Sequence, residues 1–515
     1  MNQNNTQNNK RIAKNTAYLY IRLLFTAFIS LYSARLILKN LGVEDFGIYN
    51  VVAGIVTFMG FLNATLSSAT QRFLTYNLGL NDSTKFRQTF SLLINIYLIF
   101  CAIVLVILEI VGPIYIGHYM TIPPERVKAA QWVFQFSLLS FLFSTFTVPH
   151  RSSIIAYEKM GMYAYIGVAE AVFGLVAVLV LPYFSYDKLV FYASLMCLIQ
   201  LGIALVLIYY CRYKLPDCRY VKYWSGSYFK ELLSYSGWNL FGSISSVLIL
   251  QGQAIVLNYF FGPIVNAAKA VADRVNSMIS QFSNNFYLAT APQIIKSYAA
   301  ENIEYMRSLV LNSSRYSFLM LLIIAAPLFV VMDSFLDLWL GTEQVTPDMV
   351  LFCQWTVIVA LINIFEQPIT TAVRATGDIK KYQVRVGVAT LSFVPLCVLS
   401  FLLGAPAYFS MVLLSLVYLV ALVIRVLIVS PIIEVKPLYY VKDVGLPICR
   451  TLLFLIICLL AVEKILLSHI VMAWIVKFVL IFIISCVGCY CLGLSARERK
   501  FVKGVIVSKI KKHNK

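Results

Sequence analysis

A polar seam follows one face of a predicted membrane-length helix, residues 264–290. At about 100° per residue, the seam covers an arc of roughly 80° and consists of Asn266, Lys269, Asp273, Ser277, Ser280 and Asn284, with Arg274 at its flank. Asp273 and Arg274 lie about 10 to 15 Å from the start of this helix, near the middle of a bilayer core about 30 Å thick. Charges at that depth face a partner or water, because facing lipid costs about 3 kcal/mol each. The seam predicts a helix that lines a path.

Three further predicted spans carry thinner seams. They comprise Asn15, Tyr18, Arg22, Thr26 and Ser33 on the first span, Asn50, Thr57, Ala64, Ser68 and Gln71 on the second, and Asn239, Ser243, Ser246 and Gln253 on the seventh. One interpretation is that these side chains hydrogen-bond neighbouring helices together. The other is that the four seams face a shared hydrophilic cavity between two halves of the chain. Both interpretations stay open, and four seams in matched positions favour the cavity.

The charged seam residues give the predicted cavity an excess of positive charge, which suits an anion and in particular phosphate oxygens. The candidate substrate-binding residues are Arg22, Lys269, Asp273, Arg274, Asn239, Gln253 and Asn266. The alternatives are structural. Lys269 and Asp273 are spaced to pair on one helix face, and Arg22 is near enough to the membrane surface to extend toward it.

Two acids lie inside other predicted spans. Glu170 and Glu366 are candidates for proton or Na⁺ coupling, or else neutral, hydrogen-bonded acids. We expect no metal and no cofactor, because the eleven cysteines are scattered through apolar runs without metal-ligand spacing. No Walker A, HExxH or GxSxG motif occurs in the sequence, so we expect no enzyme.

Composition predicts an integral membrane protein. Hydrophobic residues make up 60% of the 515 residues, charged residues 13%, and the mean hydropathy is +0.81. The net charge of +19 does not indicate nucleic-acid binding, because the basic residues lie in short loops and tails beside apolar segments.

The fold class expected is an all-α polytopic membrane protein with about fourteen spans. They are 15–38, 47–72, 89–111, 127–148, 162–184, 188–210, 236–260, 264–290, 311–332, 349–372, 384–403, 406–429, 444–467 and 470–493. The first is read as a true span, being too long for a cleaved signal peptide. Basic residues gather in one set of loops and in both tails, which predicts cytoplasmic termini.

An internal repeat divides the first twelve predicted spans into two groups of six. Pro124, Gln131 and Trp132 recur with the same spacing as Pro347, Gln354 and Trp355, and Pro149, Ala156 and Tyr163 recur as Pro368, Ala375 and Tyr382 at nearly the same offset. Gly42 and Gly262, in predicted loops about which the lobes would rock, form a weaker match. Six spans per half make the halves parallel repeats around a central cavity. The predicted bounds are an N-lobe 1–210, a cytoplasmic amphipathic linker 211–235, a C-lobe 236–430, two extra C-terminal helices in 431–494, and a basic tail 495–515.

The chain resembles a known family along nearly its whole length. LYSARLILKNLGVEDFGIYNVV, TIPPERVKAA, IIAYEKMGMYAYI, the DLWLG ending at Gly341 and RATGDIKKYQV resemble polysaccharide (O-antigen and capsule repeat-unit) flippases of the multidrug/oligosaccharidyl-lipid/polysaccharide (MOP) exporter superfamily. The resemblance implies movement of undecaprenyl-pyrophosphate-linked oligosaccharide from the cytoplasmic to the periplasmic leaflet of a bacterial inner membrane by alternating access. It also implies that Arg22 and Arg274 contact the pyrophosphate. The second span has no charge between Gly47 and Gln71, a departure from lipid II flippases that favours a glycan-repeat substrate.

The partners expected are the lipid-linked oligosaccharide, the surrounding lipids and other membrane proteins of polysaccharide assembly, with the transporter itself a monomer. Two other functions stay open. A cation-coupled multidrug or metabolite antiporter of the same superfamily would use Asp273, Glu170 or Glu366 as its leading carboxylate. A membrane-embedded glycan polymerase is disfavoured by the internal repeat and by the lack of a long outer loop.

Overall fold

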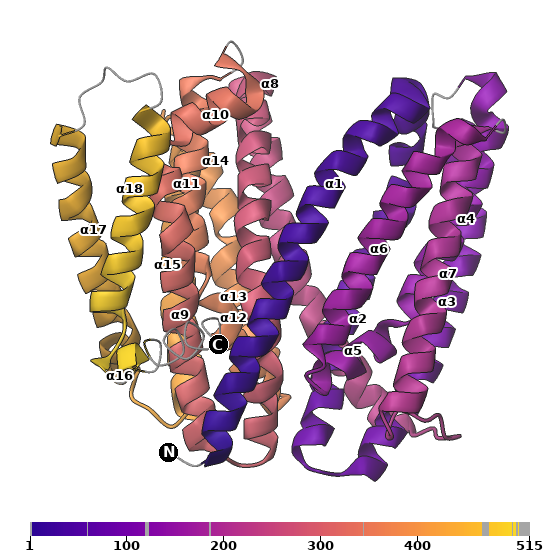
Figure 1. Ribbon diagram of the computed structural model, residues 1–515, viewed down its shortest axis with the longest axis horizontal. Helices are drawn as coiled ribbons and strands as arrows, with labels where there is room; N and C mark the ends of the chain where they lie inside the picture. Colours follow the sequence, from indigo (N-terminus) through magenta and orange to yellow (C-terminus); the bar gives the residue numbers. More distant parts are fainter. Residues whose placement is uncertain are drawn as a thin grey trace, which may run out of the picture. The chain divides into compact units, whose positions relative to one another are not determined.

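The computed structural model describes residues 3–58, 60–118, 123–184, 187–342, 345–465, 473–496, 498–500 and 503 (Figure 1). Every regular element in these ranges is helical. In chain order they are α1 (Gln3–Phe58), α2 (Gly60–Gly79), α3 (Ser83–His118), η1 (Pro124–Arg126), α4 (Val127–Phe146), α5 (Val148–Ala156), α6 (Met160–Val180), η2 (Leu181–Tyr183), α7 (Lys188–Lys214), α8 (Gly226–Ala299), α9 (Ile303–Val330), α10 (Met332–Leu340), α11 (Pro347–Asn363), α12 (Glu366–Thr376), α13 (Lys380–Leu391), α14 (Phe393–Leu402), α15 (Phe409–Ile432), α16 (Pro437–Tyr440), η4 (Val441–Gly445), α17 (Leu446–Ile465), α18 (Ala473–Gly488) and η5 (Cys489–Gly493).

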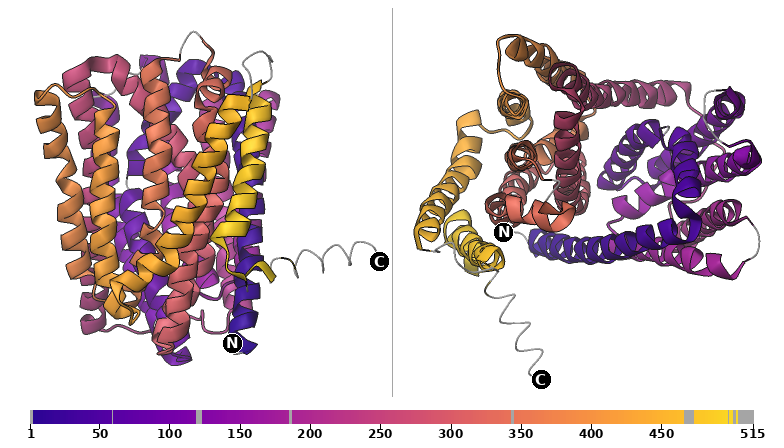
Figure 2. Two further views of the ribbon diagram at one scale, coloured as in Figure 1. Left: turned by 90° about the vertical axis from the view of Figure 1, so that its left-hand side faces the viewer. Right: turned by 90° about the horizontal axis from the view of Figure 1, so that it is seen from above.

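The chain forms two compact units. The first unit comprises 1–240 and 291–302, and the second comprises 241–290 and 303–515. Within each unit the long helices run side by side (Figure 2). These bounds differ from the predicted lobes 1–210 and 236–430, because both ends of α8 pack with the first unit while its middle packs with the second.

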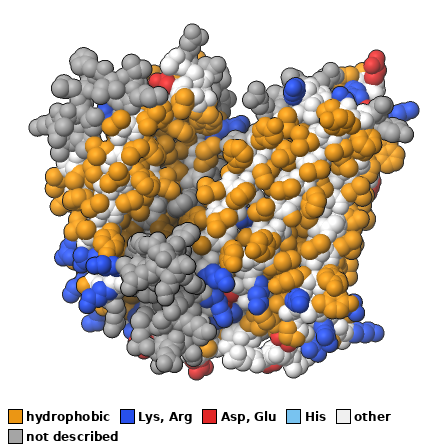
Figure 3. All heavy atoms as spheres, viewed as in Figure 1, with side chains coloured by type: hydrophobic (Ala, Val, Ile, Leu, Met, Phe, Trp, Pro, Cys, Tyr) orange, Lys and Arg blue, Asp and Glu red, His pale blue; other side chains and the backbone are white. Residues whose placement is uncertain are grey.

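The chain is a multi-pass membrane protein. Eleven of the described helical segments are long and apolar enough to cross a membrane, and they coincide with eleven of the fourteen predicted spans. The other three predicted spans, 15–38, 47–72 and 264–290, lie within α1, α1–α2 and α8. The third of them carries Lys269, Asp273 and Arg274, which makes it more polar than the rest. On the face drawn in Figure 3, hydrophobic side chains cover the middle of the helices and Lys and Arg gather toward one end.

Three pairs of unusual backbone positions recur at the spacing of the sequence repeat. Gly42 and Gly262 interrupt α1 and α8 at φ 80° and 77°. Asn81 and Glu301 have φ 54° and 55°, and Glu158 and Gly377 have φ 57° and 86°. All three pairs recur at nearly the offset that relates the matched prolines of the repeat. Gly42 and Gly262, predicted as loops, are instead kinks in long helices, since glycine adopts positive φ without a steric cost.

The two predicted spans 127–148 and 349–372 are each broken near their ends. The first divides into α4 and α5, with Pro149 in the first turn of α5. The second divides into α11 and α12, with Pro368 in the first turns of α12. Proline lacks a backbone N–H, so it fits the start of a helix and not its interior. The matched prolines of the sequence repeat therefore occupy matched breaks.

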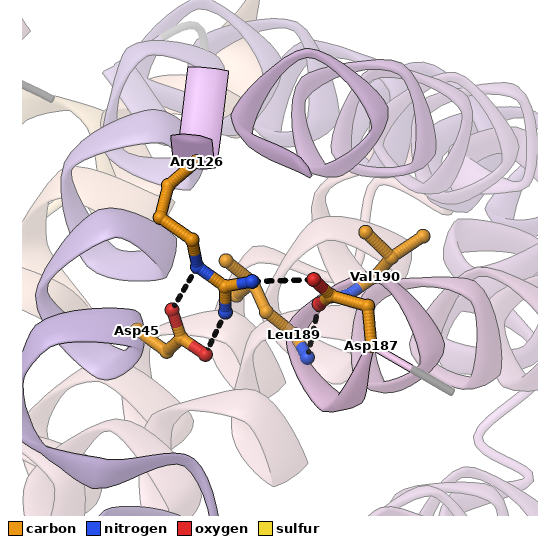
Figure 4. A network of polar contacts seen from close by, with 5 residues as sticks. All are labelled: Asp45, Arg126, Asp187, Leu189 and Val190. Carbon is orange, nitrogen blue, oxygen red and sulfur yellow. Dashed lines mark hydrogen bonds and ion pairs between the residues drawn. The ribbon is translucent and has the colours of Figure 1, made fainter. Parts of the chain in front are cut away.

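One arginine joins three elements at an end of the first unit (Figure 4). From η1, the Arg126 Nε donates to Asp45 Oδ1 at 2.9 Å, and its Nη1 donates to Asp187 Oδ2 at 2.5 Å. The other oxygen of Asp187 accepts from the N–H groups of Leu189 and Val190, which caps α7. The network fixes α1 beyond its Gly42 kink to the start of α7.

The connection between α7 and α8 is shorter than the predicted amphipathic linker 211–235. It spans 215–225, because α7 continues to Lys214 and the Ser225 side chain caps α8. The connection is extended and is held on α3: the Asn95 Nδ2 donates to the Tyr223 carbonyl at 3.2 Å, and the Val221 N–H donates to Ser91 Oγ at 2.9 Å. It therefore belongs to the first unit.

Only part of the predicted basic tail 495–515 lies within the described residues, namely 495, 496, 498–500 and 503. Glu498 accepts from the Tyr316 hydroxyl at 2.5 Å and pairs with Arg315. Burial alone would raise the pKa of Glu498, but these contacts and the Ser495 N–H outweigh it and lower that pKa below its usual value. The start of the tail is thus fixed to α9.

Candidate functional site: a polar cavity in the second unit

A cavity of about 210 Å³ lies within the second unit. Its walls come from both halves of α8 and from α9, α11, α12 and α15. The lining residues are Ser246, Ile249, Leu250, Gln253, Asp273, Asn276, Ile279, Ser280, Asn284, Tyr287, Ser317, Thr356, Val359, Ala360, Asn363, Ile364, Gln367, Met411, Leu414 and Tyr418. Part of the predicted seam of α8 therefore does line a cavity, through Asp273, Ser280 and Asn284.

The lining is rich in amides and hydroxyls. The Gln253 Nε2 donates to Ser410 Oγ at 3.2 Å and lies 3.2 Å from Met411 Sδ. The Asn363 Oδ1 is buried and has no hydrogen-bond partner among the described residues. A buried amide oxygen without a partner costs free energy unless something donates to it. The cavity therefore offers neutral donors and acceptors, the groups that bind hydroxyl-bearing molecules.

Asp273 is the one charged residue among those that line the cavity. It is not a free carboxylate: its Oδ2 accepts from Lys269 Nζ at 2.5 Å, one turn earlier on α8. The Lys269 side chain is 3% exposed and the Asp273 side chain 41% exposed. The ammonium is thus held behind the carboxylate and largely offsets its charge, so the cavity is close to neutral.

Two predicted binding residues lie in the first unit. The Arg22 guanidinium stacks 4.7 Å from the ring centroid of Tyr163, a cation–π contact. Arg22 also crosses Gly167, where a Cβ would lie 2.9 Å from the Arg22 Cδ, so glycine provides room for the arginine. The Asn239 Nδ2 donates to Ser68 Oγ at 3.2 Å. These residues pack between helices of that unit.

The remaining two predicted binding residues are Arg274 and Asn266. Arg274 is exposed on α8 and is not among the lining residues. Asn266 lies in α8, but its side chain is outside the described residues. Of the seven candidates, the structure brings together Lys269, Asp273 and Gln253.

Both candidate coupling acids have arginine partners. Glu170 accepts from Gln200 Nε2 at 2.6 Å and lies 3.6 Å from Arg151. Glu366 lies 3.0 Å from Arg425, whose side chain is 4% exposed. The Arg425 Nε also donates to the Tyr382 hydroxyl at 3.2 Å. Each acid is therefore held as a member of an ion pair.

Sequence reasoning missed the contribution of α11 and α12 to the cavity. Asn363 and Gln367 are four residues apart and flank the break at Ile364 and Phe365, where a helix exposes unpaired backbone groups. Two amides at i and i+4 beside Glu366 were the available signal. Thr356 lies two turns earlier on the same face.

Part of the chain matches a known protein family. Residues 240–399 match the family model MatE. The chain is similar to the uncharacterized membrane protein EpsK of Bacillus subtilis strain 168, with 22% identity over 336 residues, which is 64% of this chain and 65% of that protein. The match thus spans just under two thirds of the relative's length.

Solved structures share the fold at low identity. One is the outward-facing conformation of a multidrug resistance MATE family transporter of the MOP superfamily, with a TM-score of 0.71, 14% identity, and coverage of 83% of this chain and 96% of that one. Another is a MOP superfamily transporter from Pyrococcus furiosus Vc1, described as having a binding pocket of reverse polarity, with a TM-score of 0.68, 15% identity, and coverage of 82% and 96%. The chain therefore has the fold of these MOP-superfamily transporters, and the part of it that matches the MatE family model contains most of α8 and all of α9, α10, α11, α12 and α13.

Proposed function

We propose that this protein flips lipid-linked oligosaccharide repeat units, carried on undecaprenyl pyrophosphate, from the cytoplasmic to the periplasmic leaflet of a bacterial inner membrane. The observation that carries this proposal is the lining of the cavity in the second unit. Eleven of the twenty lining residues carry an amide or a hydroxyl, and Lys269 offsets the single carboxylate at 2.5 Å. Sugar hydroxyls both donate and accept, so they match such a lining. The resemblance to polysaccharide flippases supports the same substrate class.

The transport cycle is alternating access by two repeat-related units. The recurrence of Gly42 as Gly262 and of Glu158 as Gly377 at the repeat spacing supports this. Both termini are cytoplasmic in this proposal, because Lys and Arg gather in the tails and in one set of loops. Arg22 and Arg274 are the guanidinium groups proposed to meet the pyrophosphate, and the polyprenyl tail stays in lipid.

A cation-coupled antiporter is the second candidate. The observation that favours it is the fold shared with a multidrug resistance MATE family transporter. Such a protein needs an accessible carboxylate for a cationic ligand, and here Asp273 is tied to Lys269 while Glu366 is tied to Arg425. The ion pairs therefore weigh against this candidate.

Reconstitution in proteoliposomes tests the choice. The protein is given an undecaprenyl-pyrophosphate oligosaccharide in one preparation and a cationic dye in the other. We expect movement of the glycolipid and none of the dye. Movement of the dye alone would overturn the flippase proposal and support the antiporter.

A further inference from the structure

A buried carboxylate outside the cavity lies between three segments of the first unit. Glu158 is in the turn between α5 and α6, and its side chain is completely buried. Its Oε1 accepts from Lys296 Nζ and its Oε2 from Gln293 Nε2, both at 2.6 Å. Arg11 lies 3.5 Å from the same carboxylate. The Asn15 Nδ2 donates to the Glu158 carbonyl at 3.3 Å, so the beginning of α1 also meets this turn.

Both partners at 2.6 Å come from the end of α8. This helix is continuous from Pro263 to Ala299, and it passes from the second unit, which holds 241–290, into the first, which holds 291–302. The part in the second unit contributes Asp273 and Asn284 to the cavity. Whatever holds the end of α8 therefore also constrains a wall of the cavity.

The contact at this end of α8 is close, and water reaches its edge. Gly79 of α2 lies so close that a Cβ there would be 2.8 Å from the Lys296 Cα, which makes this a backbone-to-backbone contact. Arg11 is half exposed, so water reaches the edge of the cluster. Burial lowers the pKa of Lys296, while the Glu158 carboxylate acts in the opposite direction. Charges of this kind regain hydration when they separate, which offsets the loss of their contact.

The backbone gives no local reason for a glutamate at this position. Glu158 has φ 57°, a left-handed conformation that costs about 1 kcal/mol for a residue with a Cβ. The equivalent turn of the second unit has Gly377 at φ 86°, which has no such cost. At Glu158 the contacts of the side chain with Lys296 and Gln293 offset this cost.

We propose that Glu158 is a positioning residue for transport: it latches the end of α8, through Lys296 and Gln293, onto the first unit, and the cycle releases this latch when the protein opens at that end. The inference rests on the proposed transport function. The latch acts on α8 and does not touch the substrate. In the closed position it holds the wall that carries Asp273, and in the open position Glu158 and Lys296 are each hydrated.

Amide hydrogen exchange of the full-length protein in lipid nanodiscs tests the latch without any substrate. Glu158→Gln keeps the shape and removes the charge. We expect the amides of 291–302 to exchange at least about tenfold faster than in wild type, because hydrogen bonds to charged groups are lost. The matched control is Glu301→Gln, the same change at an exposed residue of similar φ, 55°, and it leaves exchange unchanged. The doubly exchanged variant Glu158→Lys with Lys296→Glu restores protection.

The thermal unfolding midpoint separates a latch from a purely structural contact. With a latch, faster exchange is confined to 291–302 and its contact segments, and the midpoint stays within about 2 °C of wild type. Unchanged exchange in Glu158→Gln overturns the proposal, and so does faster exchange in all helices with a lower midpoint. If the glutamine variant folds poorly, Glu158→Gly replaces it, because glycine removes the backbone strain at this position. We expect the same faster exchange of 291–302 in that variant. Because the readout needs no substrate, a failed latch and a failed flippase give different results.

Discussion

The turn that holds Glu158 in the first unit and the turn that holds Gly377 in the second have similar backbone conformations but different side chains. Both follow a short helix that has a matched proline in its first turn, and both adopt positive φ at the same place in the repeat. The first presents a carboxylate to the beginning of α1 and the end of α8. The second presents no side chain, and the short helix before it carries Glu366, which pairs with Arg425 inside one helix bundle.

The difference shows how location decides what a buried ion pair does. Glu158 joins segments far apart in the chain, at an edge that water reaches, so its contacts can open locally. Arg425 lies inside the second unit between Glu366 and Tyr382, where opening would require the bundle to come apart. The first pair suits a moving contact and the second suits a permanent one.

The largest expected effect tests the permanent pair. Arg425→Met leaves Glu366 without its guanidinium, and breaking a buried pair on one side costs about 3 kcal/mol or more. We expect a clear fall in the thermal unfolding midpoint of the purified protein. The control is Arg307→Met, which loses an ion pair with the 67% exposed Glu434, worth about 0 to 1 kcal/mol, and one hydrogen bond to the Ile433 carbonyl. Equal midpoints for the two variants would contradict this contrast.

A glutamate placed at Gly377 tests how much unfolding free energy a residue with a Cβ costs at this turn. Gly377→Glu puts a Cβ at φ 86°, so we expect a loss of about 1 to 2 kcal/mol of unfolding free energy. The reciprocal Glu158→Gly removes the same strain in the first turn and serves as control. If Gly377→Glu is as stable as wild type, the two turns differ in strain and the comparison fails.

The smallest expected effect concerns the polarity of the cavity. Lys269→Met removes the cation behind Asp273, which is then an accessible carboxylate. We expect a cationic dye to bind about fivefold more tightly, corresponding to about 1 kcal/mol, by equilibrium binding to the purified protein. Adding Asp273→Asn to this variant abolishes the gain. Tight dye binding by the wild type would contradict a neutral cavity.

Sequence patterns predicted much of the architecture because a membrane imposes it. Apolar runs of about twenty residues marked the helices, and Pro149 and Pro368 marked the repeat, although the helix breaks beside them were not predicted. The seam of α8 led to the cavity through Asp273, but the depth of Arg274 did not reveal that its side chain is exposed outside the cavity.

The Glu158 cluster was beyond such reasoning. Its partners Arg11 and Lys296 are far from it along the chain, on opposite sides, and lie in segments whose charges served only to orient the helices. Only the fold brings them together. The lining from Asn363 was missed for a similar reason, because the inward face of α11 is set by packing against α9 and α15.

The most direct test of the central claim compares two substrates in two proteins. Translocation in proteoliposomes is measured for an undecaprenyl-pyrophosphate oligosaccharide and for undecaprenyl pyrophosphate without a glycan, using wild type and Asn363→Leu. If the cavity of the second unit receives the glycan, the variant moves the glycolipid about tenfold more slowly, as the loss of hydrogen bonds predicts, and moves the glycan-free lipid at the wild-type rate. An unchanged glycolipid rate, or an equal loss for both lipids, would contradict a glycan site at this cavity.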